Sequence, residues 1–150
     1  MEVYRLSKAQ YASDLTGTGA KLAGGRWNKA GVPVLYTSSS RALATVEVLV
    51  HIPAFYIPFD YVLSIIWIPD NSIQVLDAKV LPLNWQDLTP PNNLQKLSDE
   101  WINAQIYLAL QVPSAVVQGE YNYLVNPHHI DFPQVKLLHQ EPYRFDSRLL

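Results

Sequence analysis

Residues 61–68 constrain the fold more than any other stretch of this sequence. They read Tyr-Val-Leu-Ser-Ile-Ile-Trp-Ile, a run that is almost continuously apolar and rich in β-branched side chains. Such a run is typical of a strand that is buried in a sheet, and it is far too short to cross a bilayer. We therefore predict a central strand here and no membrane-spanning segment.

Shorter patterns on both sides of this run predict the remaining elements. Strand patterns occur at residues 3–6, 33–38, 72–76, 113–117, 121–125 and 135–139. One helix is expected after Ser39 or Ser40, whose hydroxyl can cap it, and a second over residues 94–110. Residues 7–23 and 78–93 are predicted to be loops. Because strands outnumber helices and do not alternate with them, an α+β fold is favoured over a doubly wound parallel sheet.

Length and composition indicate one domain that is not built to bind nucleic acid directly. The chain has 150 residues, and no repeat or linker divides residues 1–150. Its net charge of -2 gives no electrostatic reason for nucleic-acid binding. The absence of cysteine excludes disulfides and thiolate zinc sites, and the N-terminus lacks the layout of a signal peptide. We expect a cytoplasmic protein whose apolar, aromatic-rich surface is partly covered by a partner.

The stretch 24–47 places a cation, a phenol and a carboxylate on three successive elements. Arg26 lies in a glycine-rich loop and either pairs with a surface carboxylate or binds a diphosphate with its planar fork. Tyr36 lies on a predicted strand and either fills the core or stacks on a flat heterocycle. Glu47 borders an apolar helical stripe and is either solvated or held in a partly dry cleft, facing a developing positive charge.

Several familiar sites are excluded by their spacing. A dinucleotide fingerprint that starts at Gly17 would need glycine where Leu22 stands, and no helix pattern opens there. A phosphate loop is excluded because the lysine and hydroxyl residue that it needs do not follow Gly24. His128 and His129 are adjacent and do not predict a metal site. Ser114 lacks the glycines of a nucleophile elbow, so it is not predicted to be a hydrolase nucleophile.

Together these residues resemble the RES-domain toxins. The resemblance runs from residue 4 to about residue 140, and it is carried by Tyr4-Arg5, Gly24-Gly-Arg-Trp-Asn28, Leu35-Tyr-Thr-Ser38, Ala42-Leu-Ala-x-x-Glu47, Pro113-Ser114 and Asn122-Tyr-Leu-Val-Asn-Pro127. The family is named for its arginine, glutamate and serine, which match Arg26, Glu47 and Ser114 here.

The resemblance implies a fold, a substrate and a partner. The fold would be like that of ADP-ribosyltransferases, a split, twisted β-sheet with flanking helices. The substrate would be NAD, consumed by hydrolysis or phosphorolysis, with no further cofactor and no metal. The partner would be an Xre-type helix-turn-helix antitoxin that covers the active site and supplies the DNA binding. The low charge and many aromatic residues favour either such a toxin–antitoxin complex or a homodimer.

The resemblance also implies roles for individual residues. The catalytic set would be Arg26, Tyr36, Glu47 and Ser114. The NAD-binding set would be Arg5, Gly25, Trp27, Asn28, Asn122 and Asn126. The acceptor stays open between water, phosphate and a protein side chain. The alternatives are a protein ADP-ribosyltransferase and a non-catalytic module that binds a nucleotide or a partner.

Overall fold

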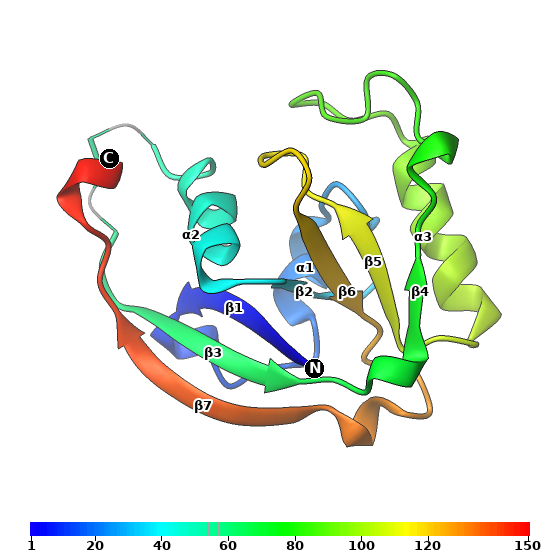
Figure 1. Ribbon diagram of the computed structural model, residues 1–150, viewed down its shortest axis with the longest axis horizontal. Coiled ribbons are helices and arrows are strands. Elements are labelled where there is room, and N and C mark those ends of the chain that lie inside the picture. Colours follow the sequence, from blue (N-terminus) through cyan, green and yellow to red (C-terminus); the bar gives the residue numbers. More distant parts are fainter. Residues whose placement is uncertain (54, 57) are drawn as a thin grey trace.

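One mixed sheet with three α-helices forms the fold (Figure 1). The computed structural model describes residues 1–53, 55–56 and 58–150. In that part the strands are β1 (Glu2–Lys8), β2 (Leu35–Ser38), β3 (Tyr61–Trp67), β4 (Ile73–Val75), β5 (Ala109–Pro113), β6 (Tyr121–Val125) and β7 (Lys136–Tyr143). The helices are α1 (Thr18–Ala23), α2 (Arg41–Leu49) and α3 (Asn93–Ala104). The strands lie in the order β4-β5-β6-β2-β1-β3-β7.

The sheet is split between β2 and β1. These two strands share a single register pair, Tyr4 with Ser38, whereas β1 pairs with β3 along its whole length. Apart from the parallel pair β4–β5, the strand pairs are antiparallel. Strand β3 lies between β1 and β7, which confirms the predicted buried strand. The split separates a half made of β4, β5, β6 and β2 from a half made of β1, β3 and β7.

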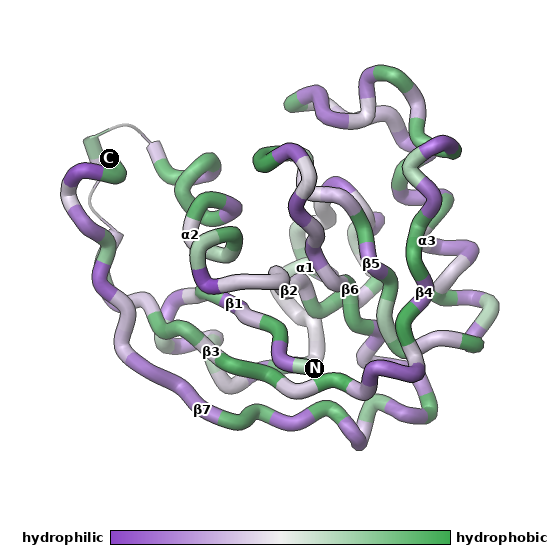
Figure 2. Tube along the Cα trace, viewed as in Figure 1, coloured by the Kyte–Doolittle hydropathy of each residue, from purple (hydrophilic) through white to green (hydrophobic). Residues whose placement is uncertain are grey.

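Each half of the sheet packs against its own helix. Helix α3 and the first half form one apolar cluster, which includes Trp27, Leu94 and Trp101. Helix α2 and the second half form another, which includes Ala44 and Leu63. Figure 2 shows the apolar residues concentrated along β3. The two helices therefore lie on either side of the split, and α2 is held beside it.

Helix α2 begins where the sequence predicts. The Ser40 hydroxyl accepts a 3.0 Å hydrogen bond from the amide of Leu43, which satisfies one free N–H group of the first turn. The buried side chains are Leu43, Ala44 and Thr45. Val50, the apolar residue that caps the end of α2, is 54% exposed. Glu47 lies at the edge of the buried face, as predicted.

Three expected boundaries are wrong. Residues 18–23, expected to be loop, form α1, which buries no side chain and so leaves no apolar period in the sequence. The helix expected over residues 94–110 ends at Ala104, because Gln105 adopts a left-handed conformation and the chain then enters β5. The strand expected at residues 113–117 is a turn, since β5 already ends at Pro113. Short apolar runs fit a helix and a buried strand equally well, which explains why the expected helix ran on into β5.

The exclusion of a dinucleotide fingerprint therefore rests on topology. A helix does open near Gly19, contrary to the expectation, but β1 and β2 on either side of it are antiparallel. The βαβ unit that such a fingerprint requires is therefore not formed. None of the described helices is long and apolar enough to cross a membrane.

Candidate active site

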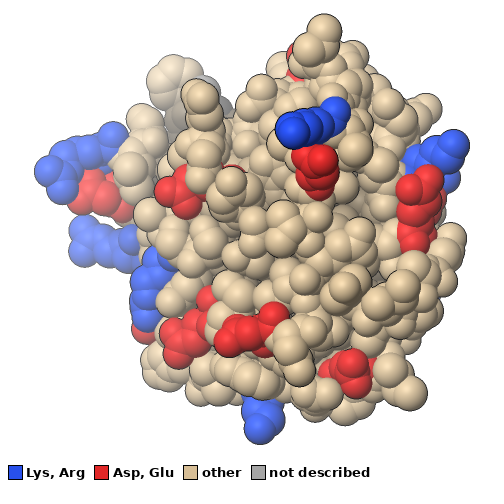
Figure 3. Space-filling view, turned by 45° about the vertical axis from the view of Figure 1, so that its right-hand side comes forward, with Lys and Arg blue, Asp and Glu red and all other residues tan. Residues whose placement is uncertain are grey.

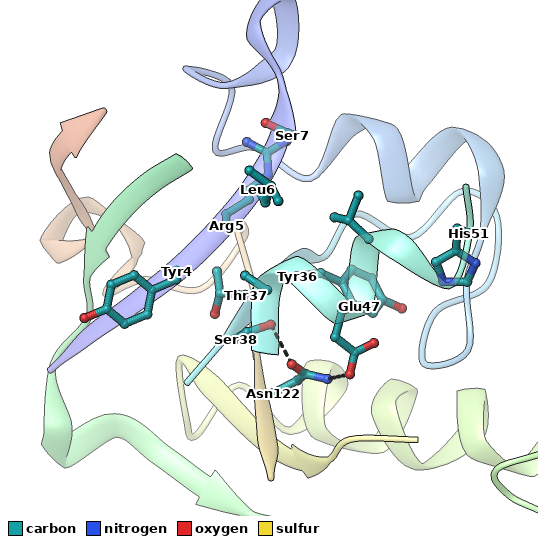
Figure 4. Close-up of a pocket in the computed structure, with 12 residues that line it drawn as sticks. Tyr4, Arg5, Leu6, Ser7, Tyr36, Thr37, Ser38, Glu47, His51 and Asn122 are labelled. Atoms are coloured by element: carbon teal, nitrogen blue, oxygen red, sulfur yellow. Dashed lines mark hydrogen bonds between the residues drawn. The ribbon is translucent and has the colours of Figure 1, made fainter. Parts of the chain in front are cut away.

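The carboxylate of Glu47 is held by two side chains that are distant in sequence. Its Oε1 accepts a 2.6 Å hydrogen bond from the Ser114 hydroxyl and a 2.7 Å bond from the Asn122 amide. Figure 4 shows Asn122 reaching Glu47 from β6. Both bonds go to the same oxygen, so among the described residues Oε2 has no hydrogen-bond donor. The carboxylate is thus fixed in orientation with one oxygen left for a ligand.

A second layer of hydrogen bonds orients these two donors. The Ser114 oxygen accepts from the amides of Val116 and Val117, at 3.1 and 2.9 Å, so its own proton points to Glu47. The Asn122 side-chain oxygen accepts a 2.7 Å bond from the Ser38 hydroxyl, which leaves its NH2 group for Glu47 (Figure 4). A network tied to the backbone in this way needs little rearrangement when a ligand binds.

Two neighbouring cavities meet at this carboxylate. Their volumes are about 370 and 640 Å³, within the range of small-molecule sites. The smaller is lined by Tyr4, Arg5 and Ser7, and the larger by residues of the glycine loop and by Leu88 and Val116. Both cavities share the lining residues Tyr36, Glu47, His51 and Asn122.

The glycine loop is folded around the Tyr36 hydroxyl. This hydroxyl donates a 2.7 Å hydrogen bond to the Asn28 side-chain oxygen and accepts a 3.2 Å bond from the Trp27 amide. Asn28 is fully buried, and its NH2 group donates to the carbonyls of Ala20 and Val32. Burial raises the pKa of Tyr36 far above its ordinary value, so the phenol stays neutral. Asn28 therefore supports the loop from within, and its side chain is not a surface of either cavity.

Gly25 is required where it stands. A Cβ atom at this position would lie 2.9 Å from the Tyr36 hydroxyl oxygen and 3.0 Å from the Asn28 side-chain oxygen. Both distances are shorter than ordinary van der Waals contact. The glycine therefore lets the loop pack directly onto the Tyr36–Asn28 pair, beside the larger cavity.

Arg26 and Trp27 point to different surroundings. The Arg26 guanidinium donates to the backbone carbonyls of Trp85 and Asp87, which are neutral acceptors at the rim of the larger cavity. Trp27 is 3% exposed and lies against Trp85, with 6.2 Å between ring centroids. Trp27 therefore anchors the loop in the core, while Arg26 carries a positive charge to the cavity.

Arg5 lines the smaller cavity from β1. Its guanidinium donates to the carbonyls of Tyr11 and Asp14, at 3.1 and 3.0 Å. Burial lowers the pKa of Arg5, and the nearby carboxylate of Asp14 opposes this shift. The structure thus places one cation on each of the two cavities that share Glu47, Arg5 on the smaller and Arg26 on the larger.

Asn126 is the predicted site residue that the structure does not bring to the others. It follows the opposite end of β6 from Asn122, about 13 Å away at the ordinary rise of a strand. It is 1% exposed, and its side-chain oxygen accepts a 2.9 Å bond from the His128 amide. Asn126 is not among the described residues that line either cavity, and its contacts are those of a turn.

His51 is a lining residue that the sequence reasoning missed. It lies four residues after Glu47, just beyond the end of α2, and borders both cavities. The signal was present in the i, i+4 spacing, which brings two side chains to the same face of a helix. Among the described residues, no group of three or more His, Asp or Glu side chains is arranged to hold a metal ion.

Comparison with solved structures identifies the class of fold. The chain superimposes on a chain of the crystal structure of the M. tuberculosis MbcT-MbcA toxin-antitoxin complex with a TM-score of 0.76. The match covers 95% of this chain and 84% of that one, at 20% sequence identity. With its split sheet, the fold is of the ADP-ribosyltransferase-like class, as the resemblance predicts.

Sequence comparisons identify the family. The profile of the RES domain matches residues 2–146. A protein named Toxin Res from Photorhabdus laumondii is 38% identical over 152 residues, which cover 100% of this chain and 97% of that protein. A Prs ADP-ribosylating toxin from Sphingobium sp. is 37% identical over 93% of this chain and 88% of its own length. The chain belongs to the RES domain family, which confirms the resemblance drawn from its sequence.

Proposed function

We propose that this protein is the toxin of a toxin–antitoxin pair and that it cleaves the bond between nicotinamide and ribose in NAD. The observation that carries the proposal is the Glu47 carboxylate, fixed by Ser114 and Asn122 where two cavities meet. In NAD one ribose carries the nicotinamide on one side and the ADP part on the other. The two parts can therefore occupy the two cavities, with this ribose beside Glu47. The family membership and the relatives named Toxin Res support the toxin role.

The chemistry asked of Glu47 is electrostatic. As the C1′–N1 bond breaks, its electron pair leaves with the nicotinamide ring and positive charge builds on the ribose. The free Oε2 of Glu47 then faces an oxocarbenium-like sugar, in a site where part of the solvent is excluded. Nicotinamide leaves as a neutral ring without taking a proton, so no second carboxylate is needed as a general acid.

The cations and Tyr36 have supporting roles. Arg26 binds the diphosphate or the adjacent ribose, and Arg5 is a second phosphate ligand. Tyr36 presents its ring to the nicotinamide, since its hydroxyl is already bonded within the loop. The acceptor forms a bond to C1′ with its lone pair and releases its proton to solvent. Water, phosphate and a protein side chain can each react in this way.

Transfer to a protein is the second candidate function. It is favoured by the relative named Prs ADP-ribosylating toxin, which is 37% identical to this chain. Transfer and hydrolysis share the same bond cleavage and differ only in the acceptor. The third candidate function is a module that binds NAD without cleaving it. Such a module would show saturable binding of NAD and release no nicotinamide.

The proposed partner is an antitoxin of the Xre type, bound over the site. Large apolar side chains near the mouth of the larger cavity are exposed, among them Leu88 at 101% and Val50 at 54%. Figure 3 shows a face on which charged side chains are scattered among uncharged ones. Exposed apolar side chains beside a cavity suit coverage by another protein, either the antitoxin or a second copy of this chain.

The test is to incubate the purified protein with NAD in water, in phosphate and with a cell lysate. Free nicotinamide and ADP-ribose in water indicate hydrolysis, and ADP-ribose 1-phosphate in phosphate indicates phosphorolysis. Label on a protein from NAD carrying labelled adenine indicates transfer. If NAD saturates the protein and no nicotinamide appears under any of these conditions, the protein is a binder and the proposed function is wrong.

A further inference from the structure

A side chain of α3 holds the loop that carries Arg26. The NH2 group of Gln95 donates to the backbone carbonyl of Gly25 at 2.9 Å and to that of Asn28 at 3.1 Å. Both partners are acceptors, so only the nitrogen end of the amide can face them. These two carbonyls lie on either side of Arg26 and Trp27, so Gln95 ties together the two ends of this segment, which the Gly25 amide also joins through a 2.9 Å bond to the Asn28 carbonyl.

Two further contacts join the same loop to α3. Trp27, the residue after Arg26, is buried in a cluster with Leu94 and Trp101 of α3. The Lys29 ammonium lies 2.9 Å from the Asp99 carboxylate, one helical turn beyond Gln95. The loop is therefore seated on α3 from Gly25 to Lys29, and the Arg26 guanidinium points away to the cavity rim.

We propose that Gln95 is a positioning residue that holds Arg26 ready to bind the diphosphate of NAD. The inference rests on the proposed function, because it takes NAD as the substrate. Two consecutive glycines, Gly24 and Gly25, give the loop many conformations, and only some of them aim Arg26 at the cavity. Restricting the loop raises the fraction of molecules that are ready to bind, and so raises the affinity.

Gln95→Met is the most direct test, because methionine keeps the length of the side chain and removes both donors. We expect KM for NAD and the Kd for ADP-ribose to rise about tenfold, with kcat within twofold. Glu100→Gln is the matched control on α3. Glu100 is exposed and makes no hydrogen bond or ion pair with the loop among the described residues, so both constants should stay within twofold of the wild type.

The outcomes separate this inference from the proposed function. If the wild type releases nicotinamide from NAD and Gln95→Met keeps KM and Kd within twofold, Gln95 does not position Arg26 and the proposed function stands. If Gln95→Met lowers kcat instead of raising KM, Gln95 does not act through Arg26 and the inference is also overturned. If the wild type neither cleaves NAD nor binds ADP-ribose, the proposed function itself fails.

A second variant covers the case in which Gln95→Met does not fold. When the side chain of Gln95→Glu is ionised, it has no donor for the Gly25 and Asn28 carbonyls. When it is protonated, its single hydroxyl can donate to one of them. The two carbonyls also raise the pKa of the new side chain. We expect the KM of Gln95→Glu, relative to the wild type at the same pH, to be high at pH 8 and to recover toward pH 5. An equal ratio at both pH values would contradict a role in hydrogen bonding.

Discussion

The Ser114 hydroxyl donates a 2.6 Å hydrogen bond to Glu47 across 67 residues of sequence and across two elements of the fold. Ser114 lies in the turn after β5, and its oxygen is in turn fixed by the amides of Val116 and Val117. The turn after β5 therefore fixes the orientation of the Glu47 carboxylate on α2. This bond makes Ser114 a residue that orients Glu47, consistent with the absence of a nucleophile elbow around it.

Ser114→Ala should lower catalysis by removing that orientation. Loss of a hydrogen bond to a charged group costs about 1.5–3 kcal/mol, which corresponds to a fall in kcat of about ten- to a hundredfold. The rate of nicotinamide release from NAD measures it. Ser13→Ala is the control, because Ser13 is exposed and its hydroxyl makes only a 3.4 Å contact to Gln140. Equal rates for Ser114→Ala and the wild type would show that Glu47 needs no such support.

Gly25→Ala should disrupt the loop, whereas Gly19→Ala should not. The added Cβ at Gly25 meets the Tyr36 and Asn28 side-chain oxygens at 2.9 and 3.0 Å, and both atoms are held by hydrogen bonds. Overpacking of this kind costs about 1–3 kcal/mol. Gly19 lies within α1 with no heavy atom near its Cβ position, so alanine there should stabilise by about 0.5–1 kcal/mol. Urea unfolding measures both, and a Gly25→Ala protein as stable as the wild type contradicts the packing described.

Tyr36→Phe should destabilise the protein while keeping its aromatic ring. The Asn28 side-chain oxygen and the Trp27 amide both lose their partner, at a cost of about 1–3 kcal/mol in the free energy of unfolding. Because the ring remains, stacking on nicotinamide is retained, so KM for NAD should change less than it does in Tyr36→Ala. Chemical denaturation and steady-state kinetics on the two variants check this.

The same hydroxyl predicts a dependence of stability on alkaline pH. Burial raises the pKa of Tyr36 in the folded state above that of the unfolded chain, which is about 10. The unfolded state then loses its proton first, so the stability that this group contributes is complete below about pH 10 and falls as the pH rises further. Tyr36→Phe should show a weaker decline in the free energy of unfolding between pH 9 and pH 11. Parallel curves for the two proteins over that range would mean that Tyr36 titrates normally.

Local signals in the sequence were enough to predict the elements that carry the site. The cap at Ser40, the strand around Tyr36 and the strand at residues 121–125 all lie where their patterns placed them. The pairing of Glu47 with Ser114 and Asn122 is different, because it depends on how a split sheet brings β5 and β6 beside α2. No local pattern encodes that arrangement, so only the resemblance to the RES family indicated it.

The two missed residues carry little signal in the sequence, since Gln95 has none and His51 has only its i, i+4 spacing from Glu47. Gln95 and His51 are polar residues at helix surfaces, and such positions are usually solvated. Their contacts with the glycine loop and with the two cavities exist only in the folded chain. Asn126, predicted in the NAD-binding set, is a different case, because Asn122 at the start of β6 contacts Glu47 and the length of the strand carries Asn126 away from it.

The central claim is that Glu47 stabilises the positive charge that forms on the ribose of NAD. The most direct measurement compares kcat for nicotinamide release with the Kd for NAD in Glu47→Gln. The glutamine oxygen can still accept the bonds from Ser114 and Asn122, while the atom that faces the ribose changes from a charged oxygen to a neutral NH2 group. We predict a fall in kcat of at least about a hundredfold with a Kd within severalfold of the wild type. A Glu47→Gln protein that releases nicotinamide at the rate of the wild type would contradict this account.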